Sequence, residues 1–323
     1  MNLMEYKAER PFAQRHLLCL QEYTPDEILQ LLSLAAKLKK MRKENVPFTP
    51  LQGKKMAMIF TKPSLRTRVT FEIGCVELGG YPFMLTNEEI GLGKRESVED
   101  VARVLSRMCD GIMIRTFDQA EPLGLAESGS IPVINGLTDE FHPCQALADI
   151  LTLYEVTGGL KGKKLTFIGD GNNVAASLLI ICTKLGIDIT VACPKGFDPP
   201  AHILAWCAQN AAVSGAHYEV LHDAKEAVKG ADVVYTDVWA SMGQEAQAAE
   251  KNEIFRAFQV NEDLMELTGR KTYFLHCLPA HRGEEVTDAV MEASYSVVFD
   301  QAENRLHAEK AVMAMLMGAE NLA

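Results

Sequence analysis

The sequence predicts an α/β fold of two domains, each built on a mostly parallel sheet flanked by helices, and three observations carry this prediction. Short apolar runs typical of buried strands alternate with helical stretches along most of the chain. This alternation occurs twice, each time over about 150 residues, which is an ordinary domain size. The 323 residues are also enough for two separate hydrophobic cores.

The first helix is expected over residues 24–40, "TPDEILQLLSLAAKLKK". Thr24 can cap it, Pro25 suits the first turn, and Glu27 completes a capping box. Apolar residues then recur every three or four positions, so one face of this helix should be buried.

Four strands are expected in the first half and five in the second, with helices between them. The strand runs are "KKMAMIF", "YPFML", "GIMIRTF", "IPVING", "KLTFIGD", "DITVAC", "HYEVLH", "DVVYTDV" and "TYFLHCL". Helices are expected to begin near residues 65, 97 and 120, and to cover 173–185, 199–213, 223–230 and 287–293. Two doubly wound, Rossmann-like sheets follow from this order.

A further helix, "PCQALADILTLYEVTG", is expected to join the two domains, with a hinge at Gly158 and Gly159. The amphipathic segment "DQAENRLHAEKAVMAMLMG" predicts a C-terminal helix that carries Arg305 in an early turn.

Composition and charge exclude several classes of function. Hydrophobic residues make up 48% of the chain and charged residues 23%, which is normal for a globular protein. The net charge of −11 disfavours nucleic acid and anionic membranes as partners, so a local basic pocket would be informative.

The cysteines and the N-terminal segment point to a soluble, cytoplasmic protein. The eight cysteines are scattered, with no CxxC pair and no zinc-like spacing, so reduced thiols are expected. "MNLMEYKAERPF" lacks the apolar core of a signal peptide, and no later run is long enough to span a membrane.

Almost every unusual polar cluster follows an expected strand, where ligands gather in open parallel sheets. The stretch "TKPSLRTR" contains one of them. Ser64 can cap the next helix, whose free N–H groups favour an anion, and Arg66 and Arg68 add guanidinium donors suited to phosphate. A capped surface helix with two solvated arginines is an equally good interpretation of this motif alone.

A second cluster is "FHPCQ", in which His142 and Gln145 share one face of a helix that starts near Pro143. Together they could hold a carbonyl oxygen and an amide, although an ordinary interfacial histidine is as good an interpretation. Arg115 ends an apolar strand, where its charge needs a partner.

The second half offers three more clusters. "FIGDGNN" lacks the third glycine of a dinucleotide motif, so a nicotinamide cofactor is disfavoured, and Asn172 and Asn173 could instead bind a carboxylate or amide. "TDVWASMGQE" places Asp237 before a small flexible loop, as an amino-acid binder requires. In "HCLPAHRGEE", the first interpretation of Cys277 is a buried, inert cysteine.

Taken together, these clusters resemble the aspartate/ornithine carbamoyltransferase family over nearly the whole chain. "SLRTR" is similar to its Ser-Thr-Arg-Thr-Arg motif, and "HPCQ" and "HCLP" match its His-Pro-x-Gln and His-Cys-Leu-Pro motifs. "DVWASMG" resembles the loop of the ornithine-specific branch. The resemblance implies transfer of a carbamoyl group from carbamoyl phosphate to the side-chain amine of L-ornithine, giving L-citrulline and phosphate.

The same resemblance implies an organisation of the molecule. A carbamoyl phosphate-binding domain is expected over 1–148, completed by a C-terminal helix at 303–323 that packs back on it. An ornithine-binding domain is expected over 149–302. The family also implies a homotrimer or a multiple of trimers, with active sites between domains and at subunit boundaries.

The resemblance further implies the site residues, and it requires no metal and no organic cofactor. The expected catalytic residues are Arg115, His142, Cys277 and Arg305. The expected carbamoyl phosphate contacts are Ser64, Leu65, Arg66, Thr67, Arg115, His142, Gln145, Cys277, Leu278 and Arg305. The expected ornithine contacts are Asn173, Asp237, Ser241 and Met242. Arg66 is expected to face the ligand, and Arg68 to pair elsewhere.

The chain departs from the family pattern at two positions. Leu65 stands where the motif has threonine, and Gly91 stands where related enzymes often have a glutamine that reaches the neighbouring subunit. Lys94 or Arg95 could supply a charge from the same loop. We expect carbamoyl phosphate binding to be weakened or re-tuned rather than abolished.

Two alternatives remain from the sequence. The chain could be a sister carbamoyltransferase for putrescine or N-acetylornithine, although the "SMG" loop favours a free α-amino acid. Leu65 and Gly91 also leave room for a catalytically impaired regulatory paralogue. An aspartate-specific enzyme is disfavoured because extra basic residues are missing.

Overall fold

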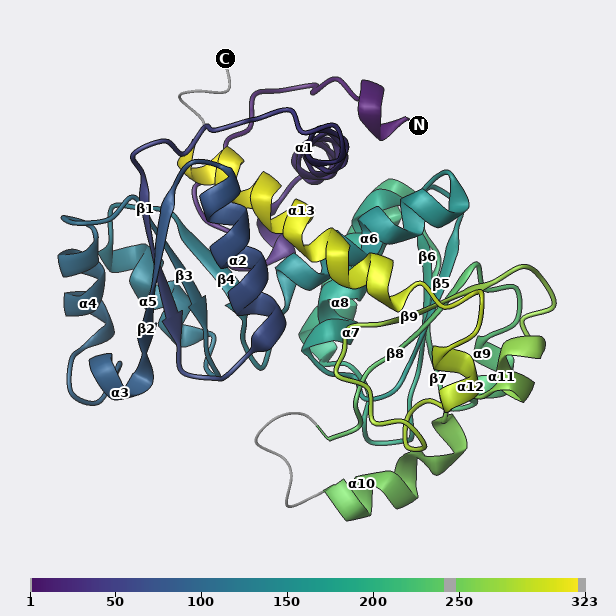
Figure 1. Ribbon diagram of the computed structural model, residues 1–323. Helices are drawn as coiled ribbons and strands as arrows, with labels where there is room; N and C mark the ends of the chain where they lie inside the picture. The colour runs from purple at the N-terminus through teal and green to yellow at the C-terminus, as the bar shows by residue number, and fades with distance from the viewer. Residues whose placement is uncertain (1, 241–247, 319–323) are drawn as a thin grey trace. The chain divides into compact units, whose positions relative to one another are not determined.

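The computed structural model describes residues 2–240 and 248–318 and divides into two compact units (Figure 1). Unit 1 comprises Met1–Leu151 and Asn304–Ala323, and unit 2 comprises Thr152–Glu303. The chain passes from one unit to the other twice, each time within a helix: α6 (Pro143–Thr157) and α13 (Val298–Met317).

Unit 1 contains a four-stranded parallel sheet with the strand order β2-β1-β3-β4. Its strands are β1 (Lys55–Phe60), β2 (Tyr81–Thr86), β3 (Gly111–Arg115) and β4 (Val133–Leu137). They coincide with the four predicted runs. Helices cover both faces of the sheet, so the side chains on both faces are mostly apolar. In the sequence these strands therefore appear as continuous apolar runs rather than as alternating apolar and polar residues.

The helices of unit 1 form two layers on this sheet, with α4 and α5 on one face and α2 and α13 on the other (Figure 1). The unit also includes α1, the short α3 and two 3₁₀ helices. Their bounds are η1 (Leu3–Glu5), η2 (Leu20–Glu22), α1 (Pro25–Lys43), α2 (Leu65–Glu77), α3 (Asn87–Ile90), α4 (Val98–Leu105) and α5 (Ala120–Ser128). The predicted capping box of α1 is confirmed: Glu27 N donates to Thr24 Oγ1, and Thr24 N donates to the Glu27 carboxylate.

Unit 2 contains a five-stranded parallel sheet with the order β7-β6-β5-β8-β9. Its strands are β5 (Lys164–Ile168), β6 (Asp188–Ala192), β7 (Tyr218–Leu221), β8 (Val233–Thr236) and β9 (Tyr273–His276). All five were predicted. The two-domain, parallel-sheet fold class is therefore confirmed.

The helices of unit 2 again cover both faces of the sheet (Figure 1). They are α7 (Asn173–Leu185), α8 (Ala201–Ser214), α9 (Ala224–Ala227), α10 (Ala248–Phe255), η4 (Arg256–Phe258), α11 (Glu262–Glu266) and α12 (Asp288–Met291). Helix α9 is shorter than the predicted 223–230, because the chain turns out of the helix before Gly230, which has a φ of +70°. Helices α10 and α11 had not been predicted.

The C-terminal helix α13 packs back on the first domain, as expected. Lys310 Nζ lies 2.6 Å from the Glu77 carboxylate of α2, and Lys39 Nζ of α1 donates to Asn304 Oδ1 at 2.8 Å. Gly74 permits the close approach of α2 and α13, because a Cβ there would lie 3.0 Å from Lys310 Cγ.

Within the described ranges, no helix combines the length and the apolarity that crossing a membrane requires.

Candidate active site

The first cluster is built at the N-terminus of α2, directly after β1. Ser64 is the N-cap, as predicted, and its Oγ accepts from Thr67 N at 3.2 Å. Arg66 is half-buried, whereas Arg68 is exposed and forms a 3.4 Å surface pair with Glu72. Arg68 thus pairs elsewhere, as expected, in a local pair on the helix surface. Leu65 is 74% exposed.

Thr67 is the centre of this cluster. Its buried Oγ1 accepts from Arg115 Nη1 at 3.3 Å and from Arg305 Nη2 at 3.0 Å. Arg115 is the last residue of β3, and β1 and β3 are the neighbouring strands at which the strand order of the sheet reverses. The cluster thus lies at the topological switch point, where open α/β sheets bind ligands. Arg305 is also fixed by Glu309, 2.8 Å away and fully buried.

His142 and Gln145 lie at the start of α6 and are both buried, so the predicted helix start near Pro143 is confirmed. Gln145 Nε2 donates to Asp149 Oδ1 at 2.8 Å. The opposite amide atom, Gln145 Oε1, and Arg305 Nε are buried without a hydrogen-bond partner among the described residues. An acceptor and a donor are thus available for a ligand.

The electrostatics of this cluster favour an anion. Burial lowers the pKa of His142 well below its usual value, and the cations Arg305, Arg115, Arg66 and Lys62 lower it further. His142 is therefore neutral at pH 7 and can donate only one N–H. The same cations that disfavour an imidazolium would stabilise a dianion.

Lys62 is a member of this cluster that the sequence analysis passed over. It is buried, lies 2.5 Å from the Asp139 carboxylate and sits 4.1 Å above the Phe117 ring. The signal in the sequence was a lysine placed directly after an apolar strand, inside the same stretch as Ser64.

Unit 2 has its own polar cluster at the switch point between β5 and β8. The buried Asp237 follows β8, and its carboxylate accepts from Val238 N at 2.8 Å, Asn172 Nδ2 at 2.9 Å and Cys277 Sγ at 2.9 Å. Asn172 is the N-cap of α7, with Oδ1 accepting from the next turn. The side-chain amide of Asn172 thus makes its hydrogen bonds within the protein. Asn173, the half-buried first residue of α7, is therefore the better candidate to bind a substrate carboxylate.

Cys277 is not the fully buried thiol that its sequence first suggested, because it is partly exposed and donates to Asp237. Leu278 follows it with a φ of +60°, which is unusual for a residue with a side chain and turns the chain sharply after β9.

Two further residues of this turn had not been identified. His276 is fully enclosed: its Nδ1 accepts from Leu278 N at 2.8 Å, so its Nε2–H donates to Glu285 Oε1 at 3.0 Å. The buried Glu285 thereby fixes the ring that holds the turn, a positioning role. Both belong to "HCLPAHRGEE", but only folding shows that its ends meet.

Two of the expected ornithine contacts, Ser241 and Met242, lie outside the described residues.

Gly91 has a conformational reason to be glycine. It caps the short helix α3 with a φ of +61°, and a Cβ there would lie 2.8 Å from Arg95 Cβ. A glutamine at this position would require the loop to adopt another conformation.

Comparison with known proteins places both halves in one family. Residues 15–155 match the profile of the aspartate/ornithine carbamoyltransferase carbamoyl-P binding domain, and residues 161–316 match that of its Asp/Orn binding domain.

Individual relatives agree over nearly the whole chain. The chain is 55% identical over 304 residues to the ornithine carbamoyltransferase of Pyrococcus abyssi, covering 94% of this chain and 96% of that protein. It is 54% identical over 306 residues to the anabolic ornithine carbamoyltransferase of Pyrococcus furiosus, covering 95% and 97%. The solved ornithine carbamoyltransferase structure from Pyrococcus furiosus superposes with a TM-score of 0.93, covering 96% of this chain and 99% of that chain.

Proposed function

This chain belongs to the aspartate/ornithine carbamoyltransferase family, and we propose that the two clusters described above carry out its reaction. The enzyme transfers the carbamoyl group of carbamoyl phosphate to the side-chain amine of L-ornithine, giving L-citrulline and phosphate. This function follows from relatives that are about 55% identical over nearly their whole length.

The convergence of Arg115 and Arg305 on Thr67 carries the assignment of the phosphate site. Carbamoyl phosphate is a small dianion, and the α2 N-terminus offers free N–H groups and a favourable dipole beside these cations. Ser64, Arg66 and Thr67 hold its phosphate, together with the backbone amide of Leu65. Arg115 bridges the phosphate and the carbonyl oxygen.

The carbamoyl end is oriented by groups with spare hydrogen-bonding capacity. Gln145 Oε1 can accept from the carbamoyl NH₂, and Arg305 Nε can donate to the carbonyl oxygen. The family motif implies the Leu278 carbonyl and Cys277 as further contacts of the carbamoyl end.

Stabilisation of the developing oxyanion is the main catalytic effect. When the amine attacks, negative charge builds on the carbonyl oxygen, and Thr67, Arg115 and His142 are the donors proposed to face it. Removing one such donor typically costs about 10²–10³-fold in rate. A neutral His142 suits this role, because it donates a hydrogen bond without giving up a proton.

The amino-acid substrate is recognised by unit 2. Asp237 takes the α-ammonium together with Ser241, and Asn173 and the amide of Met242 take the α-carboxylate. The Asp237 carboxylate accepts a hydrogen bond from Cys277 Sγ. The same negative charge would attract the α-ammonium of the substrate.

The proton balance needs no metal and no covalent intermediate. The side-chain ammonium of ornithine must first lose a proton to solvent, and Cys277 and Asp237 are the groups expected near that amine. The amine nitrogen then attacks the carbonyl carbon, and the bond from that carbon to the phosphate oxygen breaks. The phosphate accepts one of the two amine protons, and the other stays on the citrulline nitrogen.

A trimer in the cytoplasm is the setting we propose for this enzyme. Helix α2 exposes an apolar stripe formed by Val69, Ile73 and Val76, which suits a contact with another copy of the chain. None of the eight cysteines forms a disulfide, as a reducing compartment requires. The anabolic relative from Pyrococcus furiosus supports a place in arginine biosynthesis.

A parallel assay of carbamoyl acceptors tests the function. The purified enzyme is given carbamoyl phosphate with ornithine, putrescine, N-acetylornithine or aspartate, and the carbamoylated product and phosphate are measured. We expect turnover with ornithine at a kcat/KM at least about 100-fold above the others. Preference for putrescine or N-acetylornithine would move the chain to a sister activity, and turnover with none of them would identify an impaired paralogue.

A further inference from the structure

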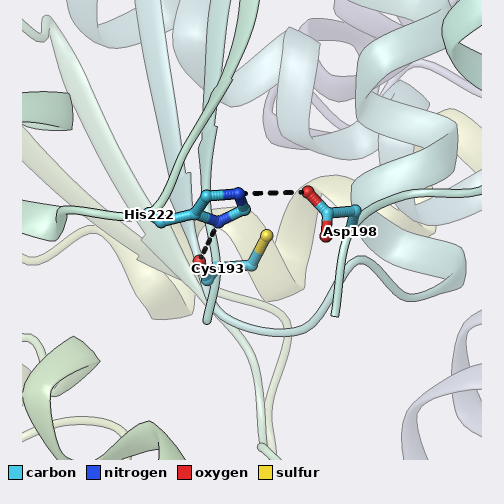
Figure 2. A group of neighbouring side chains, drawn as sticks. All are labelled: Cys193, Asp198 and His222. Atoms are coloured by element: carbon cyan, nitrogen blue, oxygen red, sulfur yellow. Dashed lines mark hydrogen bonds and ion pairs between the residues drawn. The ribbon is translucent and has the colours of Figure 1, made fainter. Parts of the chain in front are cut away.

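A second chemical cluster lies in unit 2 at the ends of β6 and β7, apart from the residues assigned to substrate binding. It consists of Cys193, Asp198 and His222, whose Sγ, carboxylate oxygen and ring nitrogen all lie within 4.8 Å of one another (Figure 2). Cys193 follows β6, His222 follows β7, and Asp198 lies in the loop between β6 and α8. The thiol and the carboxylate point toward the imidazole from two sides.

Strand pairing brings Cys193 and His222 together. Ala192 and Leu221 are the last partners in the β6–β7 register, and Cys193 N donates to Leu221 O at 3.0 Å. His222 Nδ1 lies 2.9 Å from the Cys193 carbonyl oxygen. Because a carbonyl can only accept, Nδ1 carries the hydrogen and Nε2 has the lone pair. Nε2 is the nitrogen that faces Asp198 Oδ1, at 3.6 Å.

The loop that carries Asp198 is fixed by backbone contacts. Phe197 N donates to Pro194 O at 3.1 Å, and Gly171 N donates to Phe197 O at 2.9 Å. Gly171 permits this close packing, because a Cβ there would lie 2.4 Å from Pro199 N. The glycine of "GDGNN" therefore holds this loop, and Asp198 is not a randomly placed surface carboxylate.

We propose that Cys193 Sγ, Asp198 Oδ1 and His222 Nε2 bind one divalent zinc-like cation. Thiolate, imidazole and carboxylate are the ligand types that zinc takes, and its ligands at 2.0–2.3 Å in a tetrahedron lie about 3.4–3.6 Å apart. The observed separation of 3.6 Å between Nε2 and Oδ1 matches this spacing. The fourth position faces solvent, because Asp198 and His222 are exposed and only Cys193 is buried, so a water completes the tetrahedron.

The geometry distinguishes a metal site from a cysteine nucleophile. An activated cysteine needs an imidazole nitrogen as its base, but the two nitrogens of His222 face the Cys193 carbonyl and Asp198. Burial, followed by the charges of Asp198 and Asp170, raises the pKa of the Cys193 thiol to about 12. The thiol is therefore protonated at pH 7, and binding a cation must release this proton to solvent. The carboxylates disfavour a thiolate that has no cation beside it. When a cation is bound, the same carboxylates stabilise the pair of thiolate and cation.

Cobalt(II) absorption tests this site, because thiolate-to-cobalt charge transfer reports a bound cysteine directly. The titration uses the full-length enzyme carrying Cys277→Ser, so that the cluster of Asp237, His276 and Cys277 cannot supply the thiolate. We expect one cobalt per chain with a charge-transfer band that zinc abolishes by displacement. Adding Cys193→Ser should remove the band, and adding His222→Ala or Asp198→Asn should weaken cobalt binding by at least about tenfold.

Matched controls separate metal binding from loss of folding. Cys207→Ser changes another buried cysteine of the same unit, and His217→Ala changes another exposed histidine. Both should keep the band. His222 and Asp198 are exposed, so their variants should keep the circular dichroism of the parent. Absence of the band in the Cys277→Ser enzyme, or its survival in the variant lacking Cys193, would overturn the proposal.

Discussion

Thr67 shows how one hydroxyl can organise an anion site. Its Oγ1 accepts from two arginines that come from β3 and α13, so both guanidinium groups are fixed by the same atom. Both contacts lie within the protein, so the fold itself holds the two guanidinium groups of the proposed phosphate site. Preorganisation of this kind lowers the cost of ordering charged side chains when the ligand arrives.

Leu65 is the residue whose replacement is most informative. It is 74% exposed, so Leu65→Thr should change stability by less than about 0.5 kcal/mol. The new hydroxyl could donate to the phosphate, and a hydrogen bond to a charged group contributes about 1.5–3 kcal/mol. We therefore expect the KM for carbamoyl phosphate to fall by about tenfold or more in steady-state assays.

The control for this variant is Val104→Thr, the same kind of change on the exposed side of α4. It should leave the KM unaltered. If Leu65→Thr also left both the KM and the turnover unaltered, the missing threonine hydroxyl would have no part in binding.

At the scale of elements, two helices of unit 1 have the same kind of serine N-cap but differ in what surrounds it. Ser64 caps α2 and Ser97 caps α4, each accepting from the backbone N–H three residues later, at 3.2 and 3.1 Å. Only the α2 N-terminus lies beside the cluster of arginines. The pair therefore separates the role of a cap in stability from its role in binding.

Replacing either serine with alanine should lower the free energy of unfolding by about 1 kcal/mol, measured by chemical denaturation. Only Ser64→Ala should also raise the KM for carbamoyl phosphate, by about tenfold, because its hydroxyl is expected to contact the phosphate. Equal changes of KM in the two variants would show that the hydroxyl of Ser64 acts through stability alone.

At the scale of the whole molecule, the exposed apolar face of α2 suggests a contact between subunits. Val69, Ile73 and Val76 are 48%, 43% and 57% exposed on one face of the helix, which is unusual for apolar side chains unless another surface covers them. In the proposed trimer, another subunit would cover this stripe.

Val69→Glu with Val76→Glu should break the trimer, because two carboxylates would be buried without partners. Analytical ultracentrifugation should show the wild type at about three times the 35.6 kDa of one chain and the variant at one. Val213→Glu, at an 87% exposed position in α8, is the control and should remain trimeric. A trimeric double variant would exclude the stripe from the interface.

The sequence by itself determined the local structure of this protein. The strands were predictable because fully covered parallel strands are continuous apolar runs, and the capping box of α1 and the cap of α2 were predictable because their hydrogen bonds join residues three positions apart. The sequence also indicated where chemistry would lie, because the carboxyl ends of parallel strands share one edge. Helix α9 was predicted too long, since a glycine's φ depends on its surroundings.

Only the tertiary structure decided which of these groups meet. The contact of Arg305 with Thr67 needs α13 to return to α2, and the contact of His276 with Glu285 needs a turn of a particular shape. The cluster of Cys193, Asp198 and His222 has no recognisable spacing, because the β6–β7 register and the packing against Gly171 create it. Local patterns are encoded by neighbours in the chain, whereas a site is encoded by distances between distant residues, and only packing fixes those distances.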